Sequence, residues 1–131
     1  MPDMSFGFGK QVEMDFDTAL ETVTDELQKE GFGVLSEIDV SAKMKEKLDR
    51  DMPQYRILGA CNPPLAWEAI EAVEDIGLLL PCNVLVREDK EGAVHVDFMD
   101  PASVLSLVDH RGVAPLAAQV RETLEKVYNA L

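Results

Sequence analysis

The sequence has few basic residues: 12 lysines and arginines stand against 25 aspartates and glutamates, a formal net charge of −13 over 131 residues. A chain with this charge lacks the basic surface that binds nucleic-acid phosphates or anionic lipid headgroups. Long apolar runs are also missing, because the longest uncharged apolar stretch covers only residues 76–86. A membrane-spanning helix needs about 20 such residues. We therefore expect neither nucleic acid nor membrane as a partner.

Cysteine is scarce as well, and the two that occur do not make a disulfide framework. The first residues show no basic segment followed by an apolar one, so a signal peptide is not expected and a cytoplasmic location is. Repeats, linkers and low-complexity tracts are absent from the sequence, which predicts a single domain over residues 1–131. A hydrophobic fraction of 47% argues against disorder.

Periodicity predicts the elements of that domain. Asp15 or Asp17 is expected to cap a helix that runs to Glu30, where Gly31 ends it. A hairpin is expected around the turn at residues 89–92. The remaining expected strands cover residues 5–14, 32–40 and 55–61, with hairpin arms at 78–88 and 93–99, and further helices cover residues 41–50, 62–76, 100–108 and 113–131. The order β-α-β-α-β-α-β-β-α-α predicts an α+β fold, a mostly antiparallel or mixed sheet with helices packed on it.

The same patterns predict which side chains are buried. Val34, Ile38 and Val40 should share one face of their strand, and Met44 and Leu48 should point inward from the following helix. A second group is expected along later helices, where Leu65, Ala66, Ala69, Ile70 and Val73 form one apolar stripe and Leu116, Val120, Leu124, Val127 and Leu131 another. For Trp67 we favour core packing over a contact with the preceding turn or with a second subunit.

Two Cys-Asn pairs are the strongest candidates for a functional site. Cys61 lies just before a helix that Asn62 caps, where the helix dipole can lower the pKa of a thiol. Cys82 and Asn83 follow Pro81 in the fourth expected strand. If the third and fourth strands are neighbours, the two sulfurs converge, and they can then bind a soft metal or cycle through a disulfide. The alternative is that both are inert core thiols, which are common in small domains.

Other residues are weaker candidates. His95 points away from Val94 and Val96, so it is either an ordinary surface residue or, if that face lines a groove, a base or ligand. His110 is expected to form local contacts in its loop, and Asp100 to cap a helix before any other role. A locally basic helix carries Lys43, Lys45, Lys47 and Arg50. It is either a solvated face or a surface that meets an acidic patch of a second subunit or partner.

The segments Leu58-Gly59-Ala60-Cys61-Asn62-Pro63-Pro64 and Gly77-Leu78-Leu79-Leu80-Pro81-Cys82-Asn83-Val84 resemble those of domain-of-unknown-function family 302. Residues 31–40 and Met99-Asp100-Pro101 are similar to that family's segments too, so the resemblance spans essentially the whole chain. It implies a compact α+β domain of the TATA-binding-protein-like fold group and a homodimer. It implies no established activity and no known cofactor.

Three hypotheses for function remain at this point. The favoured one is a module that binds a small ligand or metal in a groove, with Cys61, Asn62, Cys82, Asn83 and His95 as candidate contacts. The second is an interaction domain that acts as a homodimer without a ligand. The third is a thiol-based redox or sulfur-handling enzyme with Cys61 as its reactive residue, although no catalytic arrangement can be assembled from the sequence. Residues 57–65 and 76–86 are wholly uncharged, so any site should lie in a neutral part of an acidic molecule.

Overall fold

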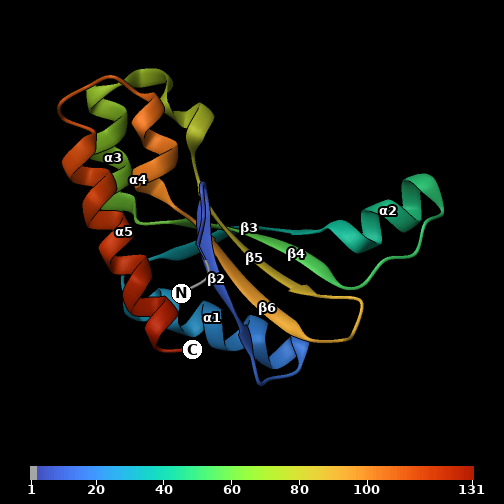
Figure 1. Ribbon diagram of the computed structural model, residues 1–131. Coiled ribbons are helices and arrows are strands. Elements are labelled where there is room, and N and C mark those ends of the chain that lie inside the picture. The colour runs from blue at the N-terminus through green and yellow to red at the C-terminus, as the bar shows by residue number, and fades with distance from the viewer. Residues whose placement is uncertain (1–2) are drawn as a thin grey trace.

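The computed structural model describes residues 3–131, and its strands form one antiparallel sheet in the order β1-β2-β6-β5-β4-β3. Helices α1 and α5 cover one face of this sheet, and α3 and α4 stand at one end of it (Figure 1). The α+β fold expected from the element order is confirmed. The elements are β1 (Asp3–Met4), β2 (Gly7–Val12), α1 (Phe16–Lys29), β3 (Gly33–Asp39), α2 (Val40–Leu48), β4 (Tyr55–Cys61), α3 (Pro63–Ala72), the 3-10 turn η1 (Glu74–Leu79), β5 (Cys82–Glu88), β6 (Val94–Met99), α4 (Pro101–Val104), η2 (Leu105–Leu107) and α5 (Ala114–Asn129).

The main core lies between the sheet and helices α1 and α5. Side chains alternate along β5 and β6, so their core-facing valines are 0–4% exposed while the outward-facing residues are half-buried or exposed. Phe8 of β2 stacks on Phe98 of β6, with 5.4 Å between ring centroids, and Tyr128 of α5 meets both rings edge-on. Helix α1 contributes four buried side chains to this core, those of Phe16, Ala19, Val23 and Leu27. This packing fixes the two long helices against the sheet.

Helix α1 begins and ends as its sequence predicts. The Asp15 carboxylate accepts a hydrogen bond from the Thr18 backbone N–H at 2.8 Å, which satisfies one of the amides left free at a helix start. At the other end Gly31 has a φ of 85°, in the left-handed region that favours glycine. The expected hairpin is also present, since β5 and β6 pair in antiparallel register across residues 89–92.

The strand β3 departs from its expected pattern. A β-bulge between Val34 and Ser36 inserts Leu35, so Val34 lies opposite Ala60 on the core face while Ile38 lies opposite Ile57 on the other face. An extra residue in one strand reverses the side-chain alternation beyond it. Val34 and Ile38 therefore do not share a face, and Val40 belongs to α2.

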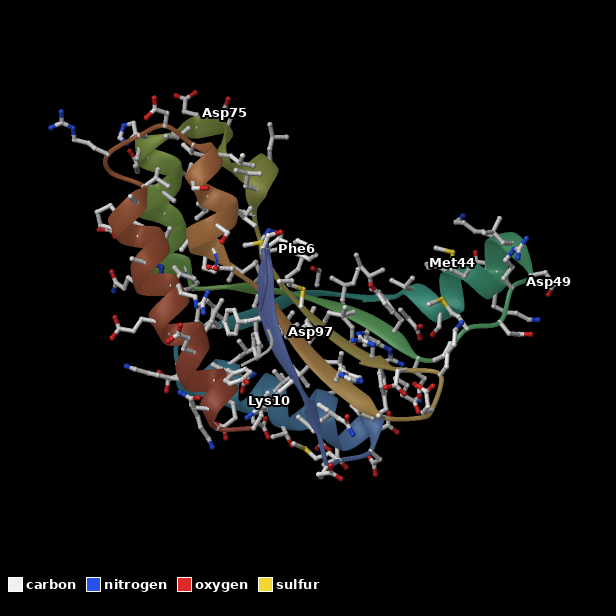
Figure 2. All side chains as sticks on the ribbon, in the orientation of Figure 1. Phe6, Lys10, Met44, Asp49, Asp75 and Asp97 are labelled. Carbon is white, nitrogen blue, oxygen red and sulfur yellow. The ribbon has the colours of Figure 1, made fainter. Side chains whose placement is uncertain are left out.

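Helix α2 is not packed on the body. It has no buried residue, Met44 is 38% exposed and Leu48 is 60% exposed. The helix projects from one end of the sheet, with Met44 and Asp49 far from Asp75 at the opposite end (Figures 1 and 2). The expectation that Met44 and Leu48 point inward was wrong, because both side chains are exposed to solvent in the single chain.

The segment before β5 is also different from the prediction. The expected strand begins at residue 78, but residues 74–79 form the 3-10 turn η1 and β5 starts only at Cys82. Pro81, preceded by a cis peptide bond, has no N–H to donate to a sheet ladder. The turn instead buries Ile76 in a second core with Ala69, Leu105, Val113 and Ala117.

Trp67 was expected in the core, but it is 67% exposed, and of the expected stripe on α3 only Ala69 is fully buried.

Within residues 3–131 no helix has both the length and the apolar composition needed to cross a membrane.

Candidate functional site

A pocket of about 380 Å³ lies at the end of the sheet where β4 finishes and β5 begins. Its walls come from the end of β4, from α3, from the η1–β5 connection and from α5, with the bulged part of β3 at its edge. Residues far apart in the sequence meet there, including Phe32, Leu65, Ala69, Leu80, Leu105 and Val120. The volume falls within the range of about 300–1,000 Å³ that is typical of small-molecule sites.

The lining of this pocket is uncharged. None of its lining residues is Asp, Glu, Lys, Arg or His, and the polar groups are the thiols of Cys61 and Cys82, the hydroxyl of Ser36 and the amide of Asn62. The chain as a whole carries 37 charged aspartate, glutamate, lysine and arginine residues (25 acidic and 12 basic). A charged group buried in this pocket would have no ion-pair partner among the lining side chains.

Sheet register explains how the two cysteines reach the same pocket. Cys82 lies opposite Ala60 in the β4–β5 ladder, and Cys61 is the next residue along β4. Alternation sends neighbouring side chains to opposite sides of a strand, so the two thiols approach the pocket from different sides of the sheet end. Cys82 is 6% exposed in the core, and Cys61 is half-buried. Both are free thiols.

Burial acts on both thiols in the same direction. Desolvation raises the pKa of Cys82 from 9.0 to about 11, and the nearby Cys61 adds to this rise because two thiolates would repel each other. Desolvation also raises the pKa of Cys61 above 9.0. The helix-dipole effect expected to lower the pKa of Cys61 does not prevail. Pro63 and Pro64 occupy the first turn of α3 and remove two backbone donors there.

Of the five candidate residues, the structure brings Cys61, Asn62 and Cys82 to one pocket and leaves two elsewhere. The Asn62 side chain caps α3, accepting from the Leu65 N–H at 3.3 Å, so its carbonyl oxygen already has a partner. Asn83 is exposed, opposite Gly59, and does not line the pocket.

His95 is separate from the cysteines. It lies on β6, on the sheet face that α1 and α5 leave uncovered, and its Nε2 lies 2.8 Å from an Asp89 carboxylate oxygen. This hydrogen bond holds the pKa of Asp89 below its ordinary value. Within residues 3–131 no three His, Cys, Asp or Glu side chains gather in a way that could hold a metal ion.

The remaining polar candidates have local structural roles. His110 accepts a hydrogen bond from the Gly112 N–H at 2.9 Å through Nδ1, as expected for a loop residue. Asp100 is 9% exposed and caps α4, accepting from Ala102 N–H at 2.9 Å and from Arg121 at 2.6 Å. Sequence reasoning did not identify Leu65, Ala66 or Leu80 as a pocket wall. Their apolar spacing is the same for a filled core as for a hollow one.

The chain matches the family model described as "Domain of unknown function DUF302" over residues 8–131. The chain belongs to the DUF302 family. A solved structure of the same fold is the crystal structure of an uncharacterised conserved DUF302 protein from Bacillus stearothermophilus, with a TM-score of 0.88 and 24% sequence identity. The likeness covers 95% of this chain and 97% of that one. No curated protein matches the chain. The resemblance stated from the Cys-Asn segments is thus confirmed, and DUF302 membership supports the fold while assigning no activity.

Proposed function

We propose that this DUF302 protein is a binding module for a small, neutral, largely apolar molecule held in the pocket between α3, α5 and the ends of β4 and β5. The observation that carries this proposal is the uncharged lining of a 380 Å³ pocket in a chain of net charge −13. Apolar walls with a few polar groups are the usual composition of small-molecule sites. The thiol of Cys61 and the hydroxyl of Ser36 would then give the ligand its orientation.

The metal and thiol-enzyme alternatives have less support. Two thiols with raised pKa values must lose their protons before they bind a metal or attack a substrate, and burial makes that loss harder. A neutral ligand needs no such ionisation. Free thiols at both positions also suit a reducing compartment, which supports the cytoplasmic location expected from the sequence.

A fluorescence titration tests the proposal with two matched probes. N-phenyl-1-naphthylamine is neutral, and 8-anilino-1-naphthalenesulfonate has the same two ring systems with one sulfonate added. We expect the neutral probe to bind with 1:1 stoichiometry. The anionic probe should bind at least about tenfold more weakly, because its sulfonate would lie among uncharged side chains. Equal binding of both probes, or no binding of the neutral one, would contradict the proposal.

A variant that fills the pocket shows where the probe binds. Ala66 of α3 is half-buried and lines the pocket, so Ala66→Phe should abolish binding of the neutral probe. Ala118→Phe is the matched control, since Ala118 is exposed on α5 and does not line the pocket. If Ala66→Phe unfolds at the wild-type temperature and still binds the neutral probe, the probe binds outside this pocket.

A second candidate function, the homodimeric interaction domain, is favoured by helix α2. A nine-residue helix is marginal in water without tertiary packing, yet α2 has no buried residue of its own. We propose that a second copy of the chain supplies the missing packing. Sedimentation velocity at increasing protein concentration tests this, with a dimer expected and a monomer at about 100 μM contradicting it.

A further inference from the structure

Two exposed surfaces at opposite ends of the molecule have opposite charges, and both carry exposed apolar side chains. The first is a basic arm, residues 40–50, which contains α2. The second is an acidic ridge, residues 67–78, which contains most of α3 and most of the turn η1. We infer that the basic arm of one copy packs on the acidic ridge of a second copy, and reciprocally. This inference rests on the proposed homodimer and names its interface.

The basic arm has a charge opposite to that of the chain. It carries four basic residues against two acidic ones in a molecule of net charge −13. Lys43 pairs with Glu46, and Lys45 pairs with Asp49 and with the neighbouring Asp51. Lys47 and Arg50 form no ion pair with any of residues 3–131. Met44 and Leu48, one helical turn apart, add an exposed apolar stripe.

The acidic ridge has the complementary composition. It carries four acidic residues and no basic one, namely Glu68, Glu71, Glu74 and Asp75. None of the four forms an ion pair within the part of the chain that the structure describes. Exposed apolar side chains lie among them, since Trp67 is 67% exposed, Ile70 43% and Leu78 86%. Apolar side chains gathered in this way are typical of interaction sites.

The arm and the ridge of one molecule cannot meet. Strand β4 runs between them, with α2 before it and α3 after it, and its seven residues alone span about 20 Å. Figure 1 shows α2 and α3 at opposite ends of the sheet, and Figure 2 shows Asp75 of the ridge far from Met44 of the arm. A second copy related by a two-fold axis brings each arm to the other copy's ridge and closes both contacts at once.

The inferred contact also reaches the pocket. Ile70 belongs to the ridge and lines the pocket. The arm of the second copy would therefore lie over one rim of the pocket mouth. Apolar burial supplies most of the affinity of such a contact, and the opposite charges guide association and make it sensitive to salt.

Two single variants and their mixture test the inference. Leu48→Asp alters only the arm, and Trp67→Asp alters only the ridge. Both residues are at least 60% exposed, so the fold should persist, which circular dichroism checks. Each variant should weaken dimerisation by about a hundredfold, because each dimer contains the altered contact twice. Ala118→Asp, on the exposed side of α5, is the control and should leave the dimer unchanged.

The mixture is the decisive part of the experiment. A heterodimer of Leu48→Asp with Trp67→Asp has one contact with both partners altered and one contact fully intact, whereas each variant homodimer has none intact. Native mass spectrometry of the mixture should therefore reveal heterodimers at concentrations where each variant alone is monomeric.

The outcomes separate this inference from the dimer itself. A monomeric wild-type protein would overturn both proposals. A dimeric wild type whose Leu48→Asp or Trp67→Asp variant stays dimeric would overturn the arm-to-ridge contact and leave the homodimer standing. Two monomeric variants that form no heterodimer on mixing would overturn the contact as well.

Discussion

The titration of Cys82 is the prediction that follows most directly from the site's electrostatics. Its pKa is raised from 9.0 to about 11, mainly by burial and further by Cys61. At pH 8 a thiol of pKa 9.0 is about 10% ionised and one of pKa 11 about 0.1%, so the reactive thiolate is about a hundredfold scarcer. The alkylation rate of Cys82 should rise tenfold per pH unit up to about pH 11.

Single-cysteine variants make the measurement specific. Cys61→Ser leaves Cys82 alone, Cys82→Ser leaves Cys61 alone, and iodoacetamide alkylation of each is followed from pH 7 to pH 10.5 by mass spectrometry. The pKa of Cys61 should also lie above 9.0. An apparent pKa below 8.5 for either thiol would refute the burial argument and favour a thiol-based enzyme. Because Cys61 contributes to the rise, the Cys61→Ser variant should have a slightly lower Cys82 pKa than the wild type.

The same shift makes stability depend on pH. The folded-state pKa of Cys82 is higher than the unfolded value, so this contribution is fully present below pH 9 and is lost as the pH rises toward 11. The loss amounts to about 1.4 kcal/mol per pH unit within that window. Urea unfolding of the wild type and of Cys82→Ala at pH 8, 9 and 10 measures the difference. Parallel pH profiles for the two proteins would contradict the shift.

Three further predictions concern the stability of the fold. Leu124→Ala removes a fully buried side chain of α5 and should lower the free energy of unfolding by about 3 kcal/mol, measured by urea denaturation; a loss below about 1 kcal/mol would show that the core there is loosely packed. Asp100→Ala removes the cap of α4 and the partner of Arg121, so it should lower the free energy of unfolding by about 2–3 kcal/mol. An unchanged urea midpoint would refute the role of this buried carboxylate. Gly9→Ala places a methyl group 2.7 Å from the Val96 carbonyl oxygen and against the Asp97 side chain. We expect the free energy of unfolding to fall by about 1–3 kcal/mol. A thermal midpoint equal to that of the wild type would contradict this close approach of the two strands.

Much of the fold could be predicted because local chemistry determines it. The Asp15 cap and Gly31 mark the ends of α1, and the alternation of valines on either side of residues 89–92 marks the hairpin. These signals lie within a few residues of one another, so they do not depend on distant parts of the chain.

The errors arose where tertiary context overrides a local pattern. The bulge at Leu35 reverses the faces of β3, and no residue type in that strand marks it. The apolar spacing of Met44 and Leu48 predicts a core-facing side, but a spacing identifies only a helix face and not the surface that covers that face. Pro81 was the available signal that β5 begins only at Cys82.

The candidate site was predictable in its neutrality but not in its shape. Residues 57–65 and 76–86 are uncharged in the sequence, and Cys61, Asn62 and Cys82 from these segments line the pocket. The hollow between them depends on how α3 and α5 pack against the sheet end, which is a relation between distant segments. The sequence predicts His95 as a base or ligand only if its strand face lines a groove, and the register puts it opposite Arg87, away from the cysteines.

The most direct test of the central claim is a crystal structure of the protein with N-phenyl-1-naphthylamine. The account predicts density for the probe in the pocket between α3 and α5, in contact with Leu65 and with the thiol of Cys61. Density for the probe only at another surface, with this pocket filled by side chains, would contradict it.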